Sequence, residues 1–156
     1  MTKITIHPTS LCGIQAKGPS SFNDVEQSGA KFSSDLWHQL IQKMIEADLP
    51  LDGLMYSVSW PADSNIPPQE VYYFCGFEST DKIEGFESLK LVGGNYFEYK
   101  CEVAADNIDE GFRRAYMEAM PASGLAGRDG QHLELYGADY DPESPIAKFT
   151  ILIPVE

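Results

Sequence analysis

Hydrophobic and polar residues alternate in several short runs of the chain, and each run predicts a β-strand. In residues 132–136, Leu133 and Leu135 share one face, whereas His132, Glu134 and Tyr136 share the other. Residues 147–155 are almost continuously apolar, which is typical of a strand inside a sheet. Similar patterns predict strands at residues 2–6, 11–16, 54–60, 71–78, 86–92 and 95–103.

Two stretches have helical periodicity instead. In the first, the apolar residues recur at helical spacing: Leu36, Trp37, Leu40, Ile41, Met44 and Ile45. Residues 18–31 predict a loop before this helix, Ser33 or Ser34 is its expected N-cap, and Pro50 ends it. The second helix should open at Asn107, with Glu110 placed to complete a capping box, and end at Pro121 and Gly124. Its apolar stripe consists of Ile108, Phe112, Ala115, Tyr116 and Ala119.

The order of predicted elements occurs twice. Each half reads strand, helix, strand, proline-rich loop and strand, and the two loops, at 63–70 and 139–145, occupy matching places. We therefore predict one α+β domain over residues 1–156, built from duplicated β-α-β-β units with pseudo-repeats at about 1–80 and 86–156. Two helices on one face of an antiparallel sheet would leave a central groove at the pseudo-two-fold axis, and such grooves are common ligand sites.

Composition narrows the classes of function. The 156 residues suffice for one well-cored domain, and 43% of them are hydrophobic. The net charge of −13 repels phosphate backbones, so we expect no direct binding of nucleic acid, whereas cationic ligands are favoured. The simpler explanation for most of these charges is solubility.

Residues that bind metals or form disulfides are few and scattered. The three cysteines (Cys12, Cys75 and Cys101) and the three histidines show no spacing typical of a zinc site or a disulfide framework. The acidic turn at 139–143 lacks the spacing of an EF-hand. We expect no metal or other cofactor. The first residues do not have the pattern of a signal peptide and no segment has membrane-spanning length, so a cytoplasmic protein without membrane contact is expected.

Four stretches resemble motifs of the GyrI-like family of small-molecule effector-binding domains, and together they span nearly the whole chain. Residues 67–77 resemble its Pro-Pro-Glu followed by a Tyr-x-x-Gly-Val strand, and residues 94–99 resemble its Gly-x-Tyr-Ala-x-Phe strand. Residues 120–124 are similar to its Pro-x-Ser-Gly helix end. Residues 134–136 and 151–155 look like its Glu-x-Tyr and its closing Ile-x-Ile-Pro-Val.

This resemblance implies a function for Glu134. In the family, the Glu of Glu-x-Tyr points into the central groove and faces hydrophobic, cationic compounds. Two positions depart from the family pattern: Ala119 stands where Trp is frequent, and Cys101 stands near a usual Gly. Either departure would change the shape of the groove and therefore the choice of ligand.

Aromatic residues are the candidate walls of that groove. A carboxylate in a low-dielectric groove favours a cationic partner, and aromatic faces add cation–π attraction of about 0.5–2 kcal/mol per contact. For Trp37 and Tyr116, which lie on the apolar stripes of the helices, core packing is the favoured interpretation, whereas for Tyr96 and Tyr136 the two interpretations balance. A His132–Glu134 pair could perform acid–base chemistry, but a solvent-facing or hydrogen-bonded histidine is favoured. The candidate ligand-binding residues are Glu134, Tyr136, Tyr96, Tyr73, Trp60 and Trp37.

Three functions remain open at this point. The leading hypothesis is a stand-alone protein that binds hydrophobic, cationic small molecules for sequestration or sensing, since 156 residues leave no room for a helix-turn-helix. The second is a hydrolase of reactive electrophiles such as cyclopropanoid compounds, with Glu134 and Tyr136 as candidate catalytic residues. The third is a gyrase-inhibitor-like interaction protein. A protein partner or a homo-oligomer is compatible with each.

Overall fold

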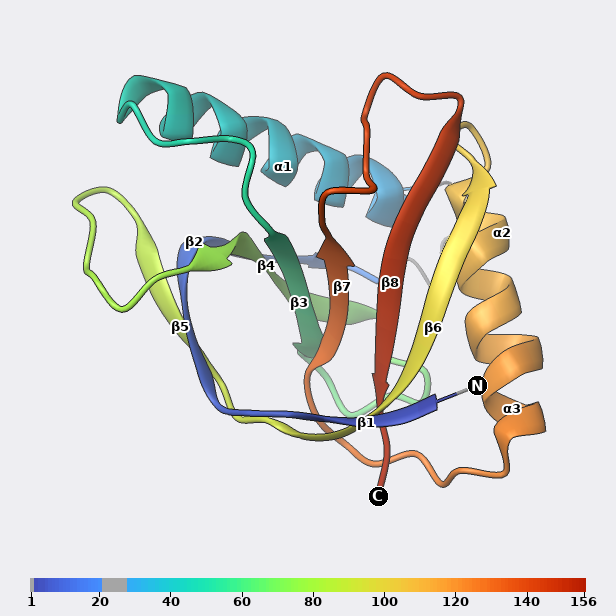
Figure 1. Cartoon of the computed structure of the whole chain (residues 1–156). Coiled ribbons are helices and arrows are strands. Elements are labelled where there is room, and N and C mark those ends of the chain that lie inside the picture. The colour runs from blue at the N-terminus through green and yellow to red at the C-terminus, as the bar shows by residue number, and fades with distance from the viewer. Residues whose placement is uncertain (1, 21–27) are drawn as a thin grey trace. The chain divides into compact units, whose positions relative to one another are not determined.

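The computed structural model describes residues 2–20 and 28–156, and they form two compact units. Of the described residues, the first unit contains 2–9 and 91–156, and the second contains 10–20 and 28–90. Each unit is a four-stranded sheet with helix on one face, so the predicted α+β class is confirmed (Figure 1). Among the described residues no helix is long and apolar enough to cross a membrane.

The sheet of the first unit has the strand order β1-β6-β8-β7. These strands are β1 (Thr2–Ile6), β6 (Gly94–Ala104), β8 (Ile146–Pro154) and β7 (His132–Tyr136). All three pairings are antiparallel, and the longest joins β6 to β8 with Cys101 opposite Phe149. The observed bounds agree with the strands that the alternation predicts.

One face of this sheet packs against a helical segment. The segment runs from α2 (Ile108–Arg113) through a π-helical turn, η2 (Arg114–Ala119), to α3 (Met120–Ser123). It ends at Gly124, whose φ of 73° is the left-handed conformation that glycine adopts without strain. The core between helix and sheet uses alternate strand residues, namely Phe97, Cys101, Val103, Ala147, Phe149, Ile151 and Ile153.

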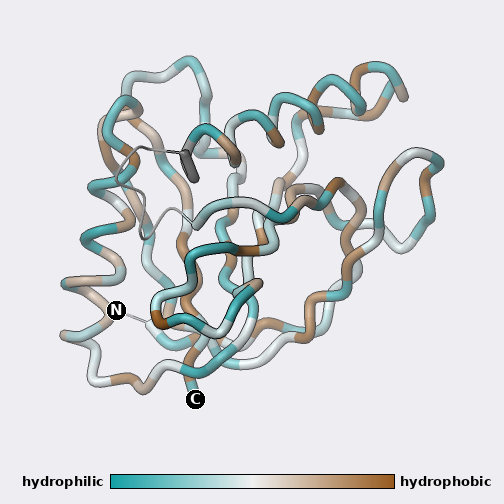
Figure 2. Tube along the Cα trace, turned by 180° about the vertical axis from the view of Figure 1, so that it is seen from behind, coloured by the Kyte–Doolittle hydropathy of each residue, from teal (hydrophilic) through white to brown (hydrophobic). Residues whose placement is uncertain are grey.

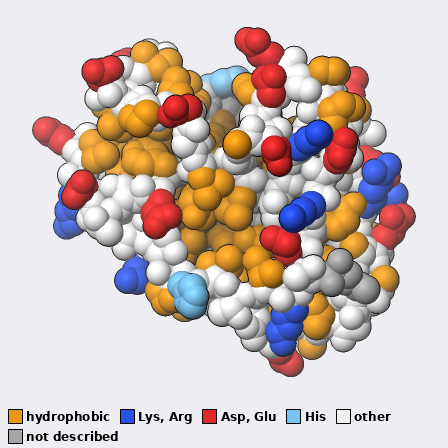
Figure 3. Space-filling model, viewed as in Figure 1, with side chains coloured by type: hydrophobic (Ala, Val, Ile, Leu, Met, Phe, Trp, Pro, Cys, Tyr) orange, Lys and Arg blue, Asp and Glu red, His pale blue; other side chains and the backbone are white. Residues whose placement is uncertain are grey.

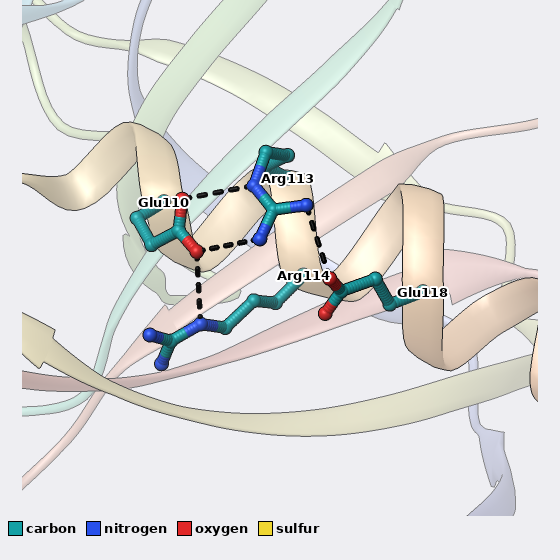
Figure 4. A network of polar contacts seen from close by, with 4 residues as sticks. All are labelled: Glu110, Arg113, Arg114 and Glu118. Atoms are coloured by element: carbon teal, nitrogen blue, oxygen red, sulfur yellow. Dashed lines mark hydrogen bonds and ion pairs between the residues drawn. The ribbon is translucent and has the colours of Figure 1, made fainter.

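The predicted capping of this helix is wrong. Asn107 is the N-cap residue, but its side chain makes no capping hydrogen bond. Glu110 instead accepts hydrogen bonds from Arg113 at 2.6 Å and from Arg114 at 3.1 Å, and Arg113 also bonds Glu118 (Figure 4). The bond from Arg113, more than any other contact, lowers the pKa of Glu110 to about 2.

The second unit repeats the arrangement with strand order β3-β4-β2-β5. Its strands are β3 (Met55–Pro61), β4 (Glu70–Glu78), β2 (Thr9–Pro19) and β5 (Glu87–Leu91). The helix α1 (Ser28–Glu46) buries Leu36, Leu40 and Met44. Figure 2 shows hydrophilic and hydrophobic positions alternating along this helix, as its sequence periodicity predicts.

The start of α1 differs from the prediction. The helix begins at Ser28, so Ser33 and Ser34 lie inside it and neither is its N-cap. Much of the predicted loop at 18–31 lies outside the described residues, and the described part belongs to β2 and α1. The order of elements does repeat along the chain. The two units nevertheless do not coincide with the two sequence repeats, because β1 pairs with β6 and β5 neighbours β2.

Candidate functional site

Glu134 lies on the helix-covered face of the first unit's sheet. In the antiparallel register Glu134 is opposite Ile151, a buried residue of the core beneath the helix. Directly opposed residues of an antiparallel pair point to the same face, so Glu134 shares that face with Ile151. Leu133 and Leu135 are opposite Leu152 and Thr150 and point to the other face, as the alternation predicts.

Aromatic side chains flank Glu134 on both sides along β7. Tyr136 donates a 2.5 Å hydrogen bond to Oε1 of Glu134, and its ring stacks on Phe149 with centroids 5.2 Å apart. Tyr140 meets the Tyr136 ring edge-on at 4.9 Å. On the other side, the His132 ring stacks on Tyr116 at 5.9 Å. The half-buried carboxylate is therefore bordered by two groups of rings.

Tyr116 and His132 also share a hydrogen bond. The hydroxyl of Tyr116 lies 2.8 Å from Nδ1 of His132. Burial raises the pKa of Tyr116 strongly, and the nearby charge of Glu134 raises it further. Burial also lowers the pKa of His132 to about 4, with a smaller contribution from Arg128. Both groups are therefore neutral at neutral pH.

Tyr96 is not brought together with Glu134. It is opposite Pro154 in β8, which places it on the face of the sheet away from Ile151. Its side chain is 1% exposed, its hydroxyl donates to the Gln131 carbonyl at 2.8 Å, and the Arg128 guanidinium lies 5.0 Å from its ring centre. These contacts hold Tyr96 within the sheet, away from Glu134.

Two candidates from the second unit, Trp37 and Tyr73, do lie together. Nε1 of Trp37 donates a 2.9 Å hydrogen bond to the hydroxyl of Tyr73, which connects α1 to the sheet face beneath it. Trp60 is opposite Tyr72 and stacks on it at 5.6 Å. Because neighbouring residues of a strand alternate, Trp60 and Tyr72 point to the face opposite Tyr73. The structure therefore separates Trp60 from the other two.

Sequence reasoning missed Tyr140 and Phe149, which complete the rings around Tyr136. It named Tyr116 and His132 separately but did not predict the contact between them, which borders Glu134. The signal for His132 was present, since it shares the Glu134 face of the predicted strand, and Tyr116 lay on the predicted apolar stripe. Nothing in the local pattern indicated that the two would meet. Among the described residues no group of three or more His, Cys, Asp or Glu side chains could hold a metal ion.

The model of the GyrI-like small molecule binding domain matches residues 1–156. The chain belongs to this family. No functionally curated protein matches the sequence of this GyrI-like protein.

Solved structures confirm the GyrI-like fold. The structure of SAV2435 bound to tetraphenylphosphonium is 15% identical, with a TM-score of 0.74, and the match covers 99% of this chain and 93% of that one. A putative bacterial transcription regulation protein from Staphylococcus aureus MU50 is 15% identical, with a TM-score of 0.73 and coverage of 99% and 97%. A hydrolase encoded by lin2189 from Listeria innocua is 11% identical, with a TM-score of 0.51 and coverage of 99% and 91%. At these identities the likeness shows the fold alone.

Proposed function

We propose that this GyrI-like protein binds hydrophobic cations in an aromatic groove around Glu134. The observation that carries the proposal is the half-buried carboxylate bordered by stacked rings on one sheet face. A carboxylate in such surroundings loses part of its hydration, which makes its charge unfavourable. A bound cation compensates that charge, and a cation with apolar substituents has a low desolvation free energy of its own. Cation–π contacts with the rings of Tyr136 and Tyr116 would add about 0.5–2 kcal/mol each.

The family and one relative support this choice of ligand. The family is one of small-molecule-binding domains, and SAV2435 has been solved with tetraphenylphosphonium, a lipophilic cation. The net charge of −13 adds a long-range attraction for cations. In Figure 3 acidic side chains are scattered over the viewed surface and not gathered in one patch, so this attraction is general and Glu134 supplies the local specificity.

The test is calorimetric titration of tetraphenylphosphonium into the wild type and into Glu134→Gln. Removing the charge is expected to weaken binding by about tenfold or more, because about 1.4 kcal/mol corresponds to each factor of ten. Glu98→Gln is the matched control. Glu98 is also a half-buried strand glutamate of the first unit, but it is opposite Leu152 and therefore points to the other face.

The outcomes separate cleanly. A selective loss in Glu134→Gln, with Glu98→Gln binding as the wild type does, would support the groove carboxylate. Equal affinity in all three proteins would refute a function for Glu134. An equal loss in both variants would mean that net charge, and not position, attracts the cation.

A hydrolase is the second candidate, and the Tyr136–Glu134 hydrogen bond favours it. A carboxylate can take a proton from water while a phenol donates one to the leaving atom, so the pair has the groups that opening a strained electrophile requires. The discriminating measurement is turnover of a cyclopropanoid electrophile in excess. A hydrolase would consume many equivalents and lose this activity in Glu134→Gln, whereas a binding protein would stop at about one equivalent.

A further inference from the structure

His132 has a position in the site that family membership does not assign. It lies two residues before Glu134 on the same face of β7, and its Nδ1 is 2.8 Å from the Tyr116 hydroxyl. The Tyr116 ring lies at 23° to the imidazole with its centroid 5.9 Å away, and it limits the orientations of the imidazole. Position, orientation and one hydrogen bond are therefore all set by the protein.

The second ring nitrogen, Nε2, is available to a ligand. Within the described part of the chain, Nε2 has no protein hydrogen-bond partner. Among those residues, the polar side-chain atom that is both fully enclosed and without a partner is Ser57 Oγ, and not Nε2 of His132. Nε2 therefore retains access to solvent or ligand. The imidazole is neutral at neutral pH, so it does not compete with a cation for Glu134.

The Tyr116 hydroxyl allows Nε2 to present a lone pair. A phenol can donate a hydrogen bond or accept one, so His132 can carry its proton on Nδ1, donate it to Tyr116 and leave Nε2 free to accept. A protonated amine has several N–H donors, and a neutral imidazole acceptor satisfies one of them while Glu134 satisfies another. A quaternary ammonium or phosphonium ion has none and gains nothing from Nε2.

The spacing suits an amine between the two groups. Residues two apart on a strand are separated by about 6.6 Å along it. An ammonium nitrogen with an acceptor about 2.9 Å away on each side spans about 5.8 Å. The backbone spacing of His132 and Glu134 is therefore of the size that one bridging ammonium requires.

Resting on the proposed function, we propose that His132 is a specificity-determining residue that makes this site prefer protonated amines to quaternary cations. Glu134 provides the charge that any cation uses. His132 provides an acceptor that only an N–H cation uses. Tyr116 is the positioning residue that holds the imidazole in place.

The test uses two ligands that differ only in N-methylation, 4-phenylbenzylammonium and trimethyl(4-phenylbenzyl)ammonium, titrated by calorimetry at pH 7. Two substitutions of His132 separate the contributions of Nδ1 and Nε2. His132→Asn keeps a polar group near Nδ1 for Tyr116 and removes Nε2, whereas His132→Gln keeps one near Nε2. His132→Asn is expected to weaken the primary amine about tenfold and to leave the quaternary ion within about twofold, and His132→Gln is expected to restore most of the difference.

Other results would overturn the inference. A similar loss of both ligands in His132→Asn would show that the ring only packs, and an unchanged ratio of the two dissociation constants would show that Nε2 does not contact the ligand. Failure of the wild type to bind either cation would instead overturn the proposed function, and this inference with it. Circular dichroism checks the folding of each variant. Tyr116→Phe is a second probe, which should lower the preference for the amine although the acceptor Nε2 of His132 is still present.

Discussion

Ser57 has a buried hydroxyl group without a hydrogen-bond partner in the described part of the second unit. Its side chain is 1% exposed, and its hydroxyl has no hydrogen-bond partner among the described residues. A buried polar group without a partner costs about 1–3 kcal/mol. We therefore expect Ser57→Ala to stabilise the protein by about 1 kcal/mol and to raise the melting temperature by about 2–4 °C.

Thermal unfolding followed by circular dichroism measures this change. Ser59→Ala is the control, because Ser59 shares the same sheet face but is only half-buried, and we expect little effect there. A lower melting temperature for Ser57→Ala would mean that the hydroxyl is bonded in solution, by water or by a ligand.

At the residue scale, alternation predicts the faces of a strand but not what covers each face. The alternation correctly placed Glu134 with Tyr136 and His132. It could not separate Tyr96 from them, since that depends on the register of β6 against β8. The favoured interpretation of His132, solvent-facing or hydrogen-bonded, is confirmed in its second form, but the partner, Tyr116, lies 16 residues away and could not be inferred from spacing.

Helix and sheet of the first unit approach each other closely at Gly111. A methyl group on Gly111 would lie 2.3 Å from Sγ of Cys101, which is itself buried. Although alanine favours helices by up to about 1 kcal/mol over glycine, we expect Gly111→Ala to destabilise the protein by about 1–3 kcal/mol through overpacking.

A double-mutant cycle in urea identifies the cause. By itself, Cys101→Ala should lower the free energy of unfolding only by the packing of the removed sulfur. In the Gly111→Ala background, the same substitution should recover most of the stability that Gly111→Ala lost. Strictly additive effects of the two substitutions would show that the clash is relieved elsewhere, for example by a shift of α2.

At the element scale, the existence and type of the helices and strands were predictable, whereas helix starts were not. Apolar periodicity identified the buried residues Leu36, Leu40 and Met44 of α1, but it wrongly included Ile45, which is 54% exposed. The helix also begins five residues before the expected cap at Ser33. The capping box at Asn107 failed because Arg113 and Arg114 bind the same carboxylate (Figure 4). A capping hydrogen bond does not form when a charged partner one turn away binds the same side chain more strongly.

At the scale of the whole chain, the sequence repeats and the compact units follow different boundaries. The first strand of each repeat neighbours the second strand of the other repeat, β1 with β6 and β5 with β2. A strand's pattern reports that it is half-buried and not which partner it has, so this exchange could not be predicted. It does explain why residues 2–9 belong to the unit that also contains residues 91–156.

The buried histidine should make the stability of the whole protein depend on pH. Burial lowers the pKa of His132 to about 4 in the folded state, below the value of about 6.5 in an unfolded chain. Between these two values the unfolded chain binds a proton that the folded protein does not bind. Acidification from pH 6.5 towards 4 therefore favours unfolding, and the stability that neutral His132 contributes above pH 6.5, at most roughly 3 kcal/mol, is lost in this window. Carboxylates such as Glu110, whose pKa is also lowered, lose their contribution only on further acidification and do so in every variant.

Urea unfolding at pH 7 and pH 4.5 is thus expected to show a larger loss of stability in the wild type than in His132→Asn, which cannot titrate there. His38→Asn, which removes an exposed imidazole from α1, should behave as the wild type does. Equal losses in the wild type and His132→Asn would show that His132 gains a proton in the folded state as easily as in the unfolded chain, and its neutrality beside Glu134 would then have to be abandoned.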